Sequence, residues 1–188
     1  MGMSCLPLRR RTRGTQTFLC AFPRLASRGG CLLLEHKRRR GGASFANRSG
    51  VWPQTRSGGH CFAGRSAGDG LVIDVSPMRS VEVVDGSASI GSGARLGELH
   101  DALGRADVTI PGGSCPSVGI AGLTLGGGLG ILGRMFGLTS DSLESAEIVL
   151  ADGRIVECDA RHDADLFWAL RGGGAGSFGV VTRLQFPT

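Results

Sequence analysis

Residues 112–138 read GGSCPSVGIAGLTLGGGLGILGRMFGL, and the rest of the chain is organised around this stretch. Ten of its residues are glycine, and bulky apolar residues separate them. Glycine loses more conformational freedom on folding than any other residue. A flexible linker would carry Ser and other polar residues in place of Leu and Ile. The composition therefore favours a loop that grips a ligand with its backbone amides over a loose connection, with Cys115 at its entrance.

Basic residues are concentrated at the start of the chain. Residues 1–55 carry 11 Lys and Arg with one acidic residue, whereas residues 56–188 carry 10 Arg with 15 Asp and Glu. The first segment suits a disordered basic tail, a targeting peptide, a nucleic-acid-binding arm or a non-native stretch read in the wrong frame. Nucleic-acid binding is the weakest of these, because no aromatic platform accompanies the charges. We therefore predict a basic, disordered or non-native segment over 1–55 and a folded body over 56–188.

Hydrophobic patterns and turn residues predict the elements of the body. Strands are expected over 70–75, 81–86, 88–91, 142–150, 155–158 and 178–186, and helices over 93–103 and 166–170. Asp85-Gly86 predicts a hairpin turn, and Asp163 or Asp165 is expected to cap the second helix. Leu96, Leu99 and Leu103 share the apolar face of the first helix. We expect His100 and Asp101 at the surface, and Cys158 and Trp168 in the core.

Several site classes are disfavoured by spacing. The six cysteines form no Cys-x-x-Cys pair, so no metal site is predicted, and their spacing is too irregular for a disulfide scaffold. No run of about 18 apolar residues predicts a membrane helix. Gly-x-Gly-x-x-Gly occurs at residues 128–133 and 174–179. A dinucleotide fingerprint follows a strand and opens a helix, whereas the second occurrence follows a predicted helix and the first has no helix cap.

Residues 56–60, RSGGH, form a second glycine loop that ends in an imidazole and is called the histidine loop below. Gly58 and Gly59 allow its backbone to approach a phosphate or a ring closely. His60 is a candidate base, metal ligand or covalent anchor. Taken alone, it is better interpreted as a structural histidine.

Together these motifs resemble a known family. RSGGH (56–60), GSCPSVG (113–119), LGGG (125–128), Arg134-x-x-Gly-Leu-x-x-Asp141, ADG (151–153), DLFWALRGGG (165–174) and FGVV (178–181) occur in its order. The sequence from residue 56 onward resembles the FAD-binding domain of the berberine-bridge-enzyme-like oxidases, in the vanillyl-alcohol-oxidase/PCMH flavoprotein superfamily. The resemblance implies an α+β fold, a PCMH-type domain of two sheet-and-helix subdomains, incomplete here at both ends.

The resemblance also implies chemistry for particular residues. The family joins the loop histidine, His60, to the flavin 8α-methyl, and in doubly linked members a cysteine, Cys115, to C6. Val118 stands where a side chain gates oxygen, and its small size favours an oxidase. The implied activity is oxidation of an alcohol or amine by O2, with FAD, a small-molecule substrate and O2 as partners. The implied FAD-binding residues are Arg56, Ser57, Gly58, Gly59, His60, Gly113, Ser114, Cys115, Val118, Gly119, Gly122, Gly126, Gly127, Gly128, Gly137, Asp141, Gly179 and Val180.

Two departures from the family pattern stand out. Residues 1–55 do not resemble the β-α-β segment that precedes the histidine loop, and residues 51–55 substitute for it poorly. The family continues into a substrate domain that commonly supplies a tyrosine base, whereas this chain has no Tyr and stops at Thr188. The resemblance therefore implies a flavin domain without its catalytic base. The alternative interpretation is a truncated fragment that binds no FAD.

Overall fold

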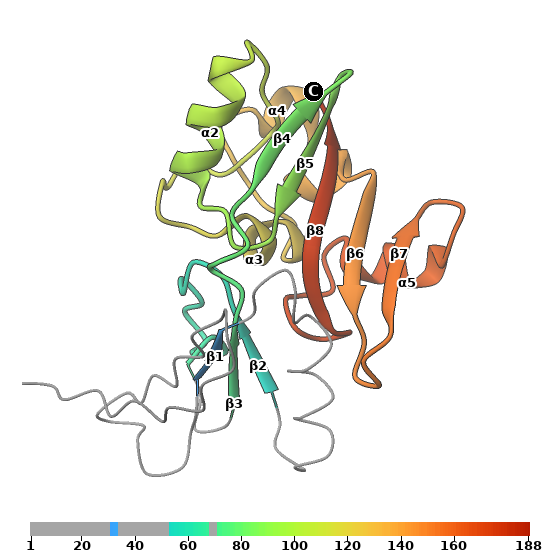
Figure 1. The fold of residues 1–188 in the computed structure, drawn as a ribbon. Coiled ribbons are helices and arrows are strands. Elements are labelled where there is room, and N and C mark those ends of the chain that lie inside the picture. The colour runs from blue at the N-terminus through green and yellow to red at the C-terminus, as the bar shows by residue number, and fades with distance from the viewer. Residues whose placement is uncertain (1–30, 34–52, 68–70) are drawn as a thin grey trace, which may run out of the picture.

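The computed structural model describes residues 31–33, 53–67 and 71–188 (Figure 1). It is a mixed helix-and-sheet structure with two sheets. The strands are β1 (Cys31–Leu33), β2 (Pro53–Arg56), β3 (Leu71–Asp74), β4 (Val81–Val84), β5 (Ser87–Gly91), β6 (Ser145–Val149), β7 (Ile155–Asp159) and β8 (Val180–Pro187). The helices are α2 (Leu96–Arg105), α3 (Ile120–Leu125), α4 (Gly133–Phe136) and α5 (Ala164–Leu170), with a 3-10 helix η2 (Thr139–Ser142).

The smaller sheet is parallel, in the order β1-β3-β2. β3 is central, and its Val72 and Ile73 are buried, as expected for a strand with neighbours on both sides. β2 runs across the division that the charge pattern suggests between residues 55 and 56. β1 and β2 were not predicted, because three or four residues are too few to show a period. The remainder of residues 1–55 lies outside the described residues.

The larger sheet is antiparallel, in the order β4-β5-β8-β6-β7. The predicted hairpin is confirmed between β4 and β5, where Asp85 and Gly86 have φ of 49° and 77°. Positive φ at both central residues is the geometry of a type I′ turn, which Asp-Gly favours. β8 lies at the centre, and its Leu184 and Phe186 are fully buried.

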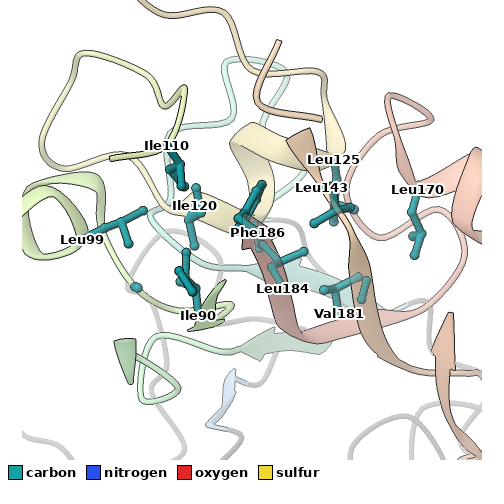
Figure 2. Packing of buried hydrophobic residues seen from close by; sticks show 14 of the residues in the cluster. Ile90, Leu99, Ile110, Ile120, Leu125, Leu143, Leu170, Val181, Leu184 and Phe186 are labelled. Carbon is teal, nitrogen blue, oxygen red and sulfur yellow. The ribbon is translucent and has the colours of Figure 1, made fainter. Parts of the chain in front are cut away.

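One hydrophobic core joins the larger sheet to α2 and α3. Leu96, Leu99 and Leu103 of α2 are buried, as the periodicity predicts. Figure 2 shows Leu99, Ile110 and Ile120 grouped beside Ile90, and Leu184 and Phe186 nearby. The glycine stretch therefore contributes to the core as well as to the surface, since Ile120 comes from it.

Two predictions about side-chain positions need correction. Trp168 is 79% exposed, so its placement in the core is wrong. α5 is short, and Phe167 and Leu170, three positions apart, form its buried face, so Trp168 points outward. Asp163 occupies the N-cap position but makes no capping hydrogen bond with its side chain. The predictions for Cys158, which is buried, and for exposed His100 and Asp101 are confirmed.

The glycine stretch is more regular than predicted. It contains α3 and α4 and leads into η2, where the sequence suggested a continuous loop. Isolated helices this short are unstable in water, so packing must hold them. Ile120, Ala121, Thr124 and Leu125 of α3 are buried. In Figure 1, α3 lies between the two sheets, and this position places the glycine stretch beside the histidine loop.

Candidate functional site

A cavity of about 570 Å³ lies where three chain segments meet. Its volume is within the range of small-molecule sites. The first segment follows β2, the second runs from Cys115 into α3, and the third precedes and enters β8. The lining residues are Thr55, Arg56, Ser57, Gly58, Gly59, His60, Cys61, Phe62, Ala63, Arg65, Ser66, Val75, Cys115, Val118, Gly119, Ala121, Gly122, Leu123, Leu125, Gly174, Ala175, Gly176, Gly179, Val180 and Val181.

The histidine loop is held at its base by an ion pair. The guanidinium of Arg56 donates to one oxygen of Asp74 from Nε at 3.0 Å and from Nη2 at 2.7 Å. The other carboxylate oxygen accepts from the backbone N–H of Ser76 at 2.9 Å. The hydroxyl of Ser57 donates to the carbonyl of Ser92 at 2.7 Å. Arg56 thus has a structural partner, and Asp74, which sequence reasoning missed, positions the loop.

The histidine loop is in close contact with the cysteine loop, residues 115–119, at a glycine of each loop, Gly58 and Gly119. A Cβ at Gly58 would overlap the backbone of residues 117–119, and a Cβ at Gly119 would overlap Ser57 and the backbone of Gly58. Gly119 has φ of −79°, so its conformation suits any residue. Glycine is therefore required here by the close contact between the two loops, and not by the backbone conformation. These two contacts bring His60 and Cys115 to one cavity.

The histidine loop presents unused backbone donors. Within the described part of the chain, the N–H groups of Gly58, Gly59 and His60 donate no backbone or side-chain hydrogen bond. Gly59 and His60 are exposed, and Gly59 has φ of 76°. Successive N–H groups in such a turn can form a concave site for an anion.

Cys115 combines exposure with hydrogen bonds to its sulfur. Its Sγ lies 3.5 Å from the hydroxyl of Ser117. Hydrogen bonds from the Ser117 side chain and backbone lower the pKa of the Cys115 thiol below its ordinary value. Burial raises the pKa of Cys158 to about 11. Because the thiolate is the nucleophilic form, Cys115 is the more reactive of these two thiols near neutral pH.

This contrast gives a testable pH dependence. We expect alkylation of Cys115 by iodoacetamide to reach half its maximal rate at a lower pH than in an unfolded peptide. Ser117→Ala should move that midpoint upward, because the largest stabilisation of the thiolate comes from the Ser117 hydroxyl. Mass spectrometry of the separate peptides distinguishes Cys115 from exposed Cys61 and buried Cys158. An unchanged midpoint in Ser117→Ala would contradict the assignment.

The third wall is a glycine loop between α5 and β8. The N–H of Gly174 donates to the carbonyl of Leu125 at the end of α3, at 2.8 Å. A Cβ at Gly176 would lie 2.9 Å from the hydroxyl of Thr55 in β2. Of this wall, the sequence identified Gly179 and Val180 but missed Gly174 to Gly176. Their glycine density, four glycines in residues 172–176 against ten in the 27 residues of the first stretch, was the available signal.

The structure divides the predicted FAD-binding residues into two groups. Those that line the cavity are Arg56, Ser57, Gly58, Gly59, His60, Cys115, Val118, Gly119, Gly122, Gly179 and Val180. Those outside its lining are Gly113, Ser114, Gly126, Gly127, Gly128, Gly137 and Asp141. In the second group, the carbonyls of Gly127 and Gly128 accept from Ser140 and Thr139 of η2, both at 2.9 Å. The Asp141 carboxylate accepts from the N–H of Leu138 at 2.8 Å.

Other site classes find no support in the described residues. They contain no group of three or more His, Cys, Asp or Glu placed to hold a metal ion. None of the helices described is long and apolar enough to cross a membrane. The first Gly-x-Gly-x-x-Gly follows α3 and ends at the first residue of α4, and the second lies between α5 and β8, so neither connects a strand to a helix.

Comparisons with known proteins agree with this geometry. Residues 43–159 match the FAD binding domain family. The chain is 44% identical over 151 residues to the FAD-linked oxidoreductase pynB of Aspergillus niger, covering 76% of this chain and 28% of that protein. Among solved structures, berberine bridge enzyme-like 1 of Physcomitrella patens superposes with a TM-score of 0.80 at 36% identity, over 84% of this chain and 36% of that one.

A third relative bears on the two candidate tethers. Glucooligosaccharide oxidase of Acremonium strictum, described with a 6-S-cysteinyl, 8α-N1-histidyl FAD, superposes with a TM-score of 0.77 at 34% identity. That match covers 86% of this chain and 35% of the oxidase. The chain thus spans about a third of the length of these relatives or less. From the family match and the shared fold, the chain belongs to the FAD-binding domain family of the FAD-linked oxidoreductases, which includes the berberine-bridge-enzyme-like proteins.

Proposed function

We propose that the cavity binds FAD, joined covalently through His60 and Cys115, as the flavin site of an oxidase that uses O2 to oxidise an alcohol or amine. The observation that carries the proposal is the convergence of His60, Cys115 and glycine backbone on one cavity. The alternative is a fragment that binds no FAD, and the FAD titration below distinguishes the two.

The residues present fit two parts of FAD, the pyrophosphate and the isoalloxazine ring. The open N–H groups of Gly58 and Gly59 suit the pyrophosphate, because backbone donors bind anions without adding bulk. Val118, Leu123 and Val180 supply apolar wall for a planar ring. The overlap that a Cβ would cause at Gly58 and Gly119 shows how closely the loops that build the site pack.

The two tethers have defined chemistry. When bound, FAD supplies two-electron redox chemistry at its ring. A tether at either residue would replace the hydrogen on a His60 nitrogen or on the Cys115 sulfur, and one hydrogen on a flavin carbon, with a new N–C or S–C bond. The two electrons and two protons released per bond would pass to O2, giving hydrogen peroxide. The lowered pKa of Cys115 provides the thiolate for its bond.

Val118 is proposed to control the approach of O2. It is partly buried, lines the cavity, and precedes Gly119 at the contact between the two loops. A valine leaves more space above a ring than a larger side chain would, and this space favours oxidase over dehydrogenase behaviour. Within the proposal, the residues of this chain hold and tune the flavin, and none of them is assigned as the base that acts on substrate.

A pair of glycine variants tests FAD binding at this cavity. Gly122 lies in α3 and lines the cavity, whereas Gly104 lies in α2 away from it. A Cβ at either position meets no protein atom within 4 Å. Both Gly→Ala changes should leave the free energy of unfolding at its wild-type value or raise it by up to about 1 kcal/mol. We expect Gly122→Ala to weaken FAD binding about tenfold, or about 1.4 kcal/mol, because its methyl occupies ligand space.

FAD titration followed by fluorescence quenching measures both variants against wild type, each in a His60→Ala/Cys115→Ala background in which no tether forms and binding is reversible. Gly104→Ala should bind FAD as wild type does. Equal affinity in all three proteins would place the flavin away from α3. Absence of binding by a cooperatively folded wild-type protein would overturn the proposal.

A further inference from the structure

The cavity wall between α5 and β8 has almost no side chains of its own. Residues 172–176 read Gly-Gly-Gly-Ala-Gly, so none is larger than a methyl group. Gly172, Gly174 and Gly176 have φ of 119°, 93° and 78°. Glycines have many accessible conformations in a loop. The position of this wall therefore depends on the bond from the Gly174 N–H to Leu125 and on the residues that flank the loop.

Arg171, directly before this loop, has its side chain fixed from several directions. Its Nε donates to the carbonyl of Ser140 at 2.9 Å. Its Nη2 donates to the carbonyl of Asp141 at 3.5 Å and lies 3.7 Å from that residue's carboxylate. The guanidinium carbon lies 5.7 Å from the centre of the Phe167 ring, within the range of a cation–π contact. Phe167 is itself buried in the core.

Arg171 is linked to the cavity in two ways, through Ser140 and through the loop that it precedes. Ser140 belongs to η2, and its N–H donates to the carbonyl of Gly127, just past the end of α3. Gly174 donates directly to the carbonyl of Leu125, the last residue of α3. Arg171 thus joins α5, η2 and the glycine stretch at the point where the wall loop begins. Leu125 and Gly174 both line the cavity.

We propose that Arg171 is a positioning residue for the FAD site, which anchors the 172–176 wall against η2 and α3. This inference rests on the proposed function for its ligand. Arg171 does not line the cavity, so it acts through the loop and through Ser140. Lysine cannot replace it fully, because a single ammonium lacks the planar fork that reaches Ser140 and Asp141 together.

The test compares Arg171→Met and Arg171→Lys with a matched control, Arg154→Met. Arg154 also pairs with a carboxylate, Asp152, at 2.6 Å, but lies in the turn between β6 and β7. Three quantities are measured: the Kd for FAD in a His60→Ala/Cys115→Ala background, where no tether forms, amide hydrogen exchange of residues 172–176 without FAD, and visible circular dichroism of bound flavin. We expect Arg171→Met to raise the Kd about tenfold and to speed exchange in the loop. Arg171→Lys should recover part of both, and Arg154→Met should match wild type.

The outcomes separate this inference from the proposed function. Unchanged Kd, loop exchange and dichroism in Arg171→Met would overturn it. So would a rise in exchange spread evenly over the whole chain, which would indicate a general structural role. If wild type binds no FAD, the proposed function fails, while the exchange data still decide whether Arg171 anchors the loop. If Arg171→Met does not fold, Arg171→Lys decides. A wild-type Kd, loop exchange and dichroism in Arg171→Lys would overturn the proposal that the guanidinium of Arg171 anchors the loop.

Discussion

Replacing Gly119 with alanine is expected to separate the two loops that build the cavity. The new Cβ would overlap Ser57 and the backbone N of Gly58, and neither can move without shifting the histidine loop. We expect a loss of about 3 kcal/mol in the free energy of unfolding, as for other overpacked sites. FAD affinity should fall about 100-fold, because the displaced histidine loop forms one wall of the cavity. At about 1.4 kcal/mol of binding free energy per tenfold change in Kd, this loss is about 2.8 kcal/mol. Denaturant titration measures the first effect, and FAD titration in a His60→Ala/Cys115→Ala background, where binding is reversible, measures the second.

The control for this prediction is Gly104→Ala, where a Cβ meets no neighbour. The φ of −79° at Gly119 is accessible to alanine, so the penalty would come from the contact alone. Wild-type stability and affinity in Gly119→Ala would show that the two loops are not held together as described. Loss of both properties in Gly104→Ala as well would point to a general intolerance of the fold.

The second large effect concerns the covalent tethers. We expect wild-type protein to retain flavin absorbance after denaturation and gel filtration. His60→Ala and Cys115→Ala should each retain flavin through the remaining tether, and the double variant should lose all of it. Cys61→Ala is the matched control, since this thiol is exposed, follows His60 and lines the same cavity.

Two results would contradict the assignment of tethers. Flavin retained by the double variant would place the bond on another residue. Loss of flavin in Cys61→Ala with retention in Cys115→Ala would place the sulfur tether at Cys61. The bound flavin of either single variant should also have a lower reduction potential, because a covalent tether raises it.

Much of the body could be predicted from sequence, and the reasons are local. The turn at Asp85-Gly86 and the leucines of α2 are short-range signals that the structure confirms. β1 and β2 were missed because they are too short to show a period and because β3 supplies their pairing. Trp168 was misplaced because the direction of a seven-residue helix depends on packing by Phe167 and Leu170.

The site was predictable in chemistry but not in geometry. The motifs named His60, Cys115 and Gly119, and the structure brings all three to one cavity. They could not separate residues that face the cavity from residues such as Gly128, whose carbonyl accepts from Thr139 of η2. Asp74 was not identified, because its partner Arg56 lies 18 positions away in the sequence.

The mass of the denatured protein tests the central claim most directly. Wild-type chain is incubated with FAD in air, unfolded, and examined intact and after proteolysis. The account predicts a gain of one FAD minus four hydrogen atoms, since two bonds form, with the flavin linking the peptides that contain His60 and Cys115. An unchanged mass, or flavin on any other peptide, would contradict it.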